Sequence, residues 1–255
     1  MKVSPTEDIT KLLVTGGLDS EKSVYSINLA DWKVTQLGDL LEGSLSKCVE
    51  KFNTETNERE ILPFEFPELL NGVSSAVIDN KVYAIGGKIE GGAIFESEKF
   101  EWIQLPKLKH NVSHHKSFVV GNVIYVTPGH GPMVMQRIDP RQRKTAVLAQ
   151  MEGTSRLCTF AKCDDCIMGC GGTTQTQVYD IEVDEWRKMS QLKRTFGGDC
   201  FGTLTHMYYF PVFAKDLITR NIAYRFNIKR EQWKEFNIHI PPLDYKNDGY
   251  SFITV

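Results

Sequence analysis

Four of the six cysteines lie between residues 158 and 170, with spacing that could support metal chemistry. Cys163 and Cys166 are separated by two residues, the spacing of a zinc knuckle, and Cys158 or Cys170 could supply further ligands. The two aspartates between Cys163 and Cys166 favour a different interpretation, a tight turn between two strands. The cysteines are then small buried residues, and we expect neither a metal site nor a cofactor.

Four histidines form the second group with possible chemistry. His110, His114 and His115 lie close together, and His130 follows a glycine. Imidazole groups bind metals and titrate near neutral pH. We interpret them as polar residues of a junction between structural repeats, and we expect His114 and His115 to contact a partner.

Motifs that would identify an enzyme are absent from the sequence. It contains no Gly-x-Ser-x-Gly, no His-Glu-x-x-His and no Gly-x-x-x-x-Gly-Lys. Its glycine pairs follow apolar, β-rich runs, whereas a phosphate-binding loop opens a helix. We therefore expect no catalytic residues.

The elements that carry these residues repeat along the chain. Apolar runs joined by Asp79-Asn80-Lys81, Gly121-Asn122 and Asp164-Asp165 predict β-hairpins. A tryptophan, or a residue in its place, recurs at spacings of 27, 43, 42, 42 and 47. A period of about 40–50 residues with four strands per unit is typical of a β-propeller. The recurring positions are Trp32, Arg59, Trp102, Lys144, Trp186 and Trp233.

These units resemble the kelch repeat, in which an apolar strand ends in Gly-Gly and a Tyr and a Trp follow. Ile85-Gly86-Gly87 and Gly171-Gly172 match the glycine pair, and Val178-Tyr179 leading to Trp186 matches the aromatic part. The resemblance implies an all-β, kelch-type β-propeller. Glycine allows close backbone packing there, and the aromatic side chains fill the space between neighbouring blades.

We divide the chain into an N-terminal tail, 1–10, and one propeller domain, 11–255, with about six units. The second unit is about 16 residues short, so we expect it to be a partial, two-stranded blade. The first unit lacks its first strand, and we expect the C-terminal segment to pair with residues 11–15, so that both chain ends close one blade. The predicted units are 11–40 with 248–255, 41–66, 67–109, 110–151, 152–193 and 194–243.

Composition narrows the possible partners. The net charge is −2, so no overall field favours nucleic acid or a membrane surface. No apolar run is long enough to span a membrane, and the first ten residues do not resemble a secretory signal. We expect a cytoplasmic protein with reduced thiols.

Loops on a rigid scaffold commonly carry recognition residues, so we predict a protein-interaction module. The expected surface is basic, includes an aromatic residue and suits an acidic or phosphorylated protein or peptide. The kelch resemblance implies substrate recognition for a ubiquitin ligase, or cytoskeletal, actin-binding scaffolding. The alternative is a propeller enzyme of the sugar epimerase or oxidase type. The predicted partner-binding residues are Lys107, Lys109, His114, His115, Arg156, Lys193, Arg194 and Phe196.

Overall fold

The protein is described here by a computed structural model, and all regular structure in its described residues is β-strand. This confirms the all-β class. The described residues are 11–15, 23–28, 34–39, 48–53, 56, 58–65, 72–79, 81–87, 92–96, 101–153, 158–171, 175–192, 197–211, 222–237 and 251–254. The strands are β1 (Lys11–Thr15), β2 (Ser23–Asn28), β3 (Val34–Asp39), β4 (Cys48–Phe52), β5 (Arg59–Glu65), β6 (Val73–Ile78), β7 (Lys81–Gly86), β8 (Gly92–Glu96), β9 (Glu101–Gln104), β10 (Ser117–Val120), β11 (Val123–Val126), β12 (Val134–Asp139), β13 (Lys144–Gln150), β14 (Cys158–Cys163), β15 (Cys166–Gly171), β16 (Gln177–Asp180), β17 (Glu185–Lys188), β18 (Gly198–Gly202), β19 (His206–Pro211), β20 (Ile222–Asn227), β21 (Gln232–Asn237) and β22 (Ser251–Thr254).

Short turns join β6 to β7, β10 to β11 and β14 to β15, as the sequence predicts. Asp79, Gly121 and Asp164 each open such a turn with a positive φ of 49°, 60° and 50°. Glycine adopts this left-handed conformation freely, and Asp tolerates it better than most residues. The strand residues that flank the turns pair directly, as Ile78 with Lys81, Val120 with Val123 and Cys163 with Cys166.

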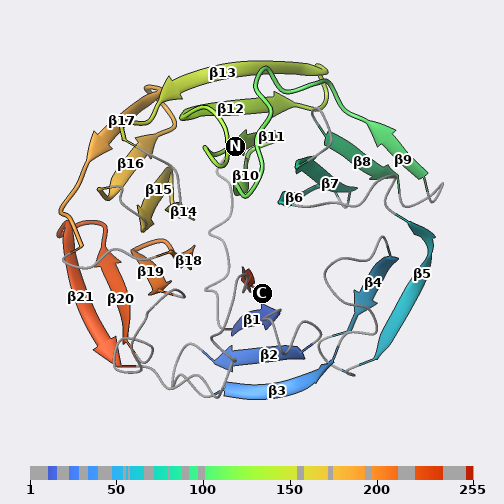
Figure 1. The fold of residues 1–255 in the computed structure, drawn as a ribbon, viewed down its shortest axis with the longest axis horizontal. Helices are drawn as coiled ribbons and strands as arrows, with labels where there is room; N and C mark the ends of the chain where they lie inside the picture. Colours follow the sequence, from blue (N-terminus) through green and yellow to red (C-terminus); the bar gives the residue numbers. More distant parts are fainter. Residues whose placement is uncertain are drawn as a thin grey trace.

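The strands form antiparallel sheets that lie side by side around a common centre (Figure 1). Within the described residues, five sheets have four strands and one, β4–β5, has two. In the sheets β6–β9, β10–β13, β14–β17 and β18–β21, the first strand lies nearest the centre and the last lies at the rim (Figure 1). The arrangement is like that of a β-propeller.

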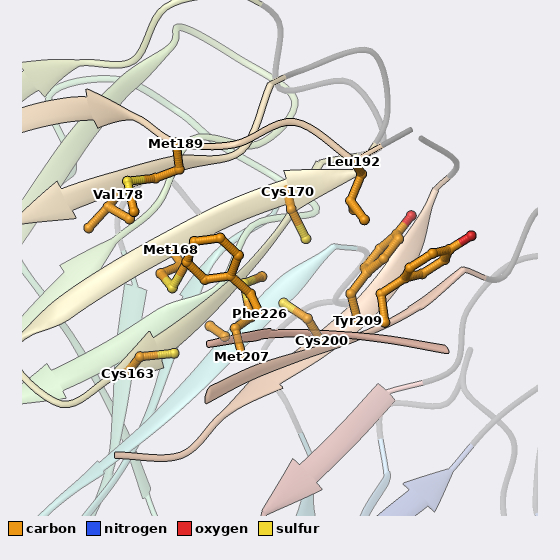
Figure 2. Packing of buried hydrophobic residues seen from close by; sticks show 12 residues of the cluster. Cys163, Met168, Cys170, Val178, Met189, Leu192, Cys200, Met207, Tyr209 and Phe226 are labelled. Atoms are coloured by element: carbon orange, nitrogen blue, oxygen red, sulfur yellow. The ribbon is translucent and has the colours of Figure 1, made fainter. Parts of the chain in front are cut away.

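The hydrophobic core lies between neighbouring sheets. Met168, Met207 and Phe226 pack where sheet β14–β17 meets sheet β18–β21 (Figure 2), and each is fully buried. A similar cluster joins Ile85 of β7 to Ile124 of β11. Burying one such side chain contributes roughly 1.5–3 kcal/mol, so each of these sheets gains its stability from its neighbours.

The two ends of the chain meet in one sheet. Strand β22 pairs antiparallel with β1, with Thr254 opposite Leu12 and Ser251 opposite Thr15. This is the pairing that the sequence predicts for residues 11–15. The two-stranded sheet β4–β5 occupies the position of the short second unit. The predicted tail, 1–10, and Trp32 lie outside the described residues.

The strand register corrects one position of the repeat. Trp186 lies opposite Tyr179, and Trp233 lies opposite Phe226, in the outer two strands of their sheets. In sheet β10–β13 the residue at this position, opposite Ile138, is Thr145. The sequence assignment of Lys144 was therefore one residue too early, because Lys144 begins β13 opposite Asp139 and the spacing from unit to unit is not constant.

In each of three cases, the residue at this position donates a hydrogen bond to the last strand of the preceding sheet or to the segment that follows that strand. Trp186 Nε1 donates to Ala149 O at 3.3 Å, and Trp233 Nε1 donates to Ser190 O at 3.1 Å. Thr145 Oγ1 donates to Lys107 O at 3.0 Å. Thr145 thus makes the hydrogen bond that the tryptophan makes in the other two sheets, although threonine has no aromatic ring.

Candidate binding surface

Residues 105–116, which we call the junction segment, connect β9 to β10 and are held by the sheets on both sides. Its Val112 O accepts a 2.8 Å hydrogen bond from Gly87 N, and His114 N donates one of 2.8 Å to Gly72 O. On the other side, Lys116 O accepts a 3.0 Å hydrogen bond from Thr127 N. The backbone of the segment is therefore fixed between sheets β6–β9 and β10–β13.

A buried glutamine also fixes the backbone of the junction segment. Gln136 of β12 receives a 2.9 Å hydrogen bond from His110 N on Oε1 and donates one of 2.9 Å to His110 O. Gln177 of β16 makes the same pair of contacts with Glu152, the corresponding residue after β13. Both glutamines are 2% exposed, so each satisfies the backbone of one junction inside the protein.

The outward side of the junction segment is basic. Lys107, Lys109, His110 and His114 are exposed. The stretch 105–138 contains three lysines, one arginine and four histidines but no aspartate or glutamate. A run without any carboxylate on a fixed backbone gives a local positive field in a protein whose net charge is slightly negative.

His115 differs from the sequence expectation because its side chain is buried, with 6% of its surface exposed. Its ring packs where a Cβ on Gly86 would collide with it, and a Cβ on Gly129 would collide with the His115 Cβ. Neither ring nitrogen has a hydrogen-bond partner among the described residues. Burial lowers the pKa of His115 to about 4, and positive charge on His114 and Lys116 acts in the same direction. His115 therefore packs between sheets and does not belong to the exposed surface.

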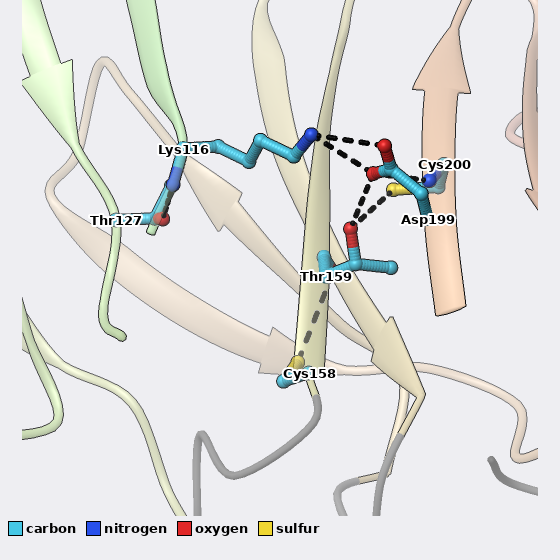
Figure 3. A network of polar contacts seen from close by, with 6 residues as sticks. All are labelled: Lys116, Thr127, Cys158, Thr159, Asp199 and Cys200. Atoms are coloured by element: carbon cyan, nitrogen blue, oxygen red, sulfur yellow. Dashed lines mark hydrogen bonds and ion pairs between the residues drawn. The ribbon is translucent and has the colours of Figure 1, made fainter. Parts of the chain in front are cut away.

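A polar network joins three sheets near their inner strands (Figure 3). Lys116 Nζ lies 2.9 Å from Oδ1 of Asp199, which also accepts hydrogen bonds from Thr159 Oγ1 at 3.1 Å and Cys200 N at 2.8 Å. Burial disfavours the charged ammonium, but the charge and hydrogen bond of Asp199 together outweigh it and raise the pKa of Lys116. The charge of Lys116 is balanced by that of Asp199, so Lys116 adds little to the positive field of the exposed surface.

The remaining predicted contact residues are Arg156, Lys193, Arg194 and Phe196, and they lie outside the described residues. Of the predicted set, Lys107, Lys109 and His114 are both described and exposed, and all three belong to the junction segment.

The cysteines that the sequence singles out are packing residues. Cys163 and Cys170 are fully buried, Cys170 within the cluster of Figure 2. Burial raises the pKa of both thiols well above the ordinary range, and it raises the pKa of the half-buried Cys166 to about 11. Such thiols are poor nucleophiles and poor metal ligands. The part of the chain that the structure describes holds no group of three or more His, Cys, Asp or Glu side chains suited to a metal ion.

Comparisons with known proteins bear on the fold alone. No protein-family profile matches the chain, and no curated protein matches its sequence. Among solved structures, the chain is similar to the structure of YjhT with a TM-score of 0.72 and 12% identity, covering 91% of this chain and 96% of that one. In all, 626 solved chains show a significant likeness, so the fold is common and does not by itself select an activity. The described residues contain no helix long and apolar enough to cross a membrane.

Proposed function

We propose that this chain is a protein-interaction module that binds an anionic segment of a partner protein, acidic or phosphorylated, through its junction segment. One observation carries the proposal. The backbone of the segment is fixed by Gly72, Gly87 and Gln136, while Lys107, Lys109 and His114 remain exposed. A preorganised basic surface binds anions with little loss of conformational entropy, and basic side chains form charge-assisted hydrogen bonds with carboxylates and phosphates.

We further propose that the scaffold is a closed, kelch-type β-propeller of six units with a partial second blade. The β1–β22 pairing and the two-stranded sheet β4–β5 support this proposal. The kelch resemblance adds the two candidate settings, substrate recognition for a ubiquitin ligase and cytoskeletal scaffolding, in a cytoplasmic location. The alternative, a sugar-active enzyme, gains no support from the network of Figure 3, because Lys116 and Asp199 satisfy each other between the sheets.

The test is a peptide array that presents acidic, phosphorylated and neutral peptides to the purified chain. The variant Lys107→Glu/Lys109→Glu should lose most binding to the anionic peptides, with its thermal stability unchanged because exposed charges contribute little to folding. The control Arg141→Glu/Lys144→Glu changes the charge equally at two exposed positions, one in the turn before β13 and one at the start of β13, so it should bind like the wild type. Equal binding by both variants, or no preference for anionic peptides, would contradict the proposal.

A further inference from the structure

Two histidines from separate loops meet at the exposed side of the junction segment. His114 belongs to the segment, and His130 belongs to the connection between β11 and β12. Their ring centroids lie 4.5 Å apart, and the ring planes are tilted by 32°. The Ser113 hydroxyl lies 3.2 Å from Nδ1 of His114. We call Ser113, His114 and His130 the histidine notch.

The backbone around the notch holds its side chains in place. Ser113 and His130 form an antiparallel bridge, in which His130 N donates to Ser113 O at 2.7 Å and Ser113 N donates to His130 O at 3.3 Å. His114 has a φ of 52°, and its N–H is fixed on Gly72 O. Few residues other than glycine adopt this conformation, so its presence requires support from the surrounding structure. The two rings are therefore positioned before any ligand arrives.

We infer that the histidine notch receives the anionic group of the partner segment, a carboxylate or phosphoryl group, and takes up protons as it does so. This inference rests on the proposed function and assigns its central contact. A neutral imidazole offers one donor and one acceptor, whereas an imidazolium offers two donors and a positive charge. An anion beside the two rings, within reach of their N–H groups, favours the protonated forms, while two adjacent imidazolium ions without an anion repel each other. Proton uptake and anion binding are therefore coupled, and affinity rises as pH falls.

The charges around the notch favour an anion. On the junction segment itself, the neighbouring ionisable groups are Lys109, His110, His115 and Lys116. Among the described residues, the backbone contacts of sheet β6–β9 with the segment come from Gly72, Gly86 and Gly87, which carry no charge. The loop of His130 contains no carboxylate. One carboxylate of the described residues, Asp199 of β18, is paired with Lys116 of the segment, and it also accepts hydrogen bonds from Thr159 and Cys200.

The experiment follows the histidine ring signals by NMR while the intact chain is titrated with inorganic sulfate at pH 7.5 and pH 6.0. Sulfate keeps the same charge at both values, so any pH dependence belongs to the protein. The rings of His114 and His130 should shift, and the dissociation constant should fall about five-fold or more at the lower pH. A glutamate-containing peptide and its phosphoserine and serine counterparts extend the measurement to both anionic groups. The glutamate peptide should show the same pH dependence as sulfate.

Two variants test the notch itself. His114→Asn suits the positive φ, which asparagine tolerates, and His130→Asn removes the opposite ring. Each should abolish the pH dependence, whereas His110→Asn, an exposed histidine of the same segment, should retain it. Ring signals that do not respond to sulfate, or anionic peptides bound equally at both pH values by the wild type, would overturn the inference while leaving the basic surface possible. Sulfate binding at the notch without peptide capture would instead refute the proposed function, and of the inference only a pH-dependent site for small anions would stand.

Discussion

The ammonium group of Lys116 lies 2.9 Å from Oδ1 and 3.1 Å from Oδ2 of Asp199, a residue 83 positions further along the chain. The pair joins the start of β10 to β18, and Thr159 of β14 donates to the same carboxylate. Asp199 is 6% exposed and the lysine side chain 29%, so the pair is largely shielded from water. It links the inner strands of three sheets and fixes the end of the junction segment.

Removing the carboxylate of this pair should destabilise the protein more than removing the ammonium. Asp199→Ala leaves a shielded charge and Thr159 without their acceptor, and the expected loss is about 2–4 kcal/mol in the free energy of unfolding. Lys116→Met should cost less, because Thr159 and the Cys200 amide still satisfy the carboxylate. Urea denaturation of both single variants and the double variant measures the coupling.

The matched control for this cycle is the exposed ion pair of Lys188 with Glu152, whose side chains are 53% and 71% exposed. Solvent screens such a pair, so Lys188→Met should change the free energy of unfolding by less than about 1 kcal/mol. An equal loss at Asp199 and at the exposed pair would show that the network does not bind the sheets together.

The sequence allows the local features to be predicted, because they depend on residues that are close in the chain. The turns at Gly121 and Asp164 and the glycines before the aromatic strands belong to this class. So does the incomplete second sheet, since the spacing of 27 is too short for four strands. The pairing of β22 with β1 is the exception, and it could be predicted because both ends lack a partner within their own units.

The contacts that define the candidate site could not be predicted in this way. The ion pair of Lys116 with Asp199 could not be predicted, because sequence does not show which junction faces which across the inner strands. His115 was assigned to the surface with His114, because sequence does not show that its ring packs against Gly86 of the neighbouring sheet. Gln136 and Gln177 did carry a signal, since they recur 41 residues apart in phase with the repeat.

Gln136 should determine how firmly the junction segment is held. Gln136→Leu conserves most of the volume but leaves His110 N and O without this partner, which should destabilise the protein by roughly 1–3 kcal/mol. Local amide exchange at 109–111 should accelerate, and binding of anionic peptides should weaken. Gln177→Leu, which removes the same contacts from Glu152, should destabilise similarly without weakening the binding. Binding that is unaffected by Gln136→Leu would show that a fixed segment is not required.

The cysteines of β14 and β15 should resist alkylation in the folded protein. Cys163 and Cys170 are fully buried with raised pKa values, so their thiolate fractions are negligible at pH 8. Cys166, which is partly exposed and has a pKa of about 11, should react slowly. Peptide mapping after iodoacetamide treatment, with and without urea, assigns the modification to each position. Rapid labelling of Cys170 under native conditions would show that the sheet interface of Figure 2 opens readily.

His115 should make the protein sensitive to mild acid. Its folded-state pKa of about 4 lies below the ordinary value of 6.5, so the unfolded chain binds its proton more tightly than the folded one. This histidine therefore costs no stability above pH 6.5, and stability is lost as pH falls from 6.5 towards 4. The full difference between the two pKa values corresponds to a loss on the order of 3 kcal/mol in the free energy of unfolding. Urea denaturation at several pH values measures it.

The variant His115→Phe separates this effect from that of the other titrating groups. A phenyl ring has similar volume and carries no proton, and the nitrogens that it replaces have no hydrogen-bond partner among the described residues. The variant should match the wild type to within about 1.5 kcal/mol at pH 7.5, as volume-conserving core substitutions do. Between pH 6.5 and pH 4 it should lose less stability than the wild type. The same slope in both proteins would mean that other groups cause the acid sensitivity and that the His115 ring is not buried in its neutral form.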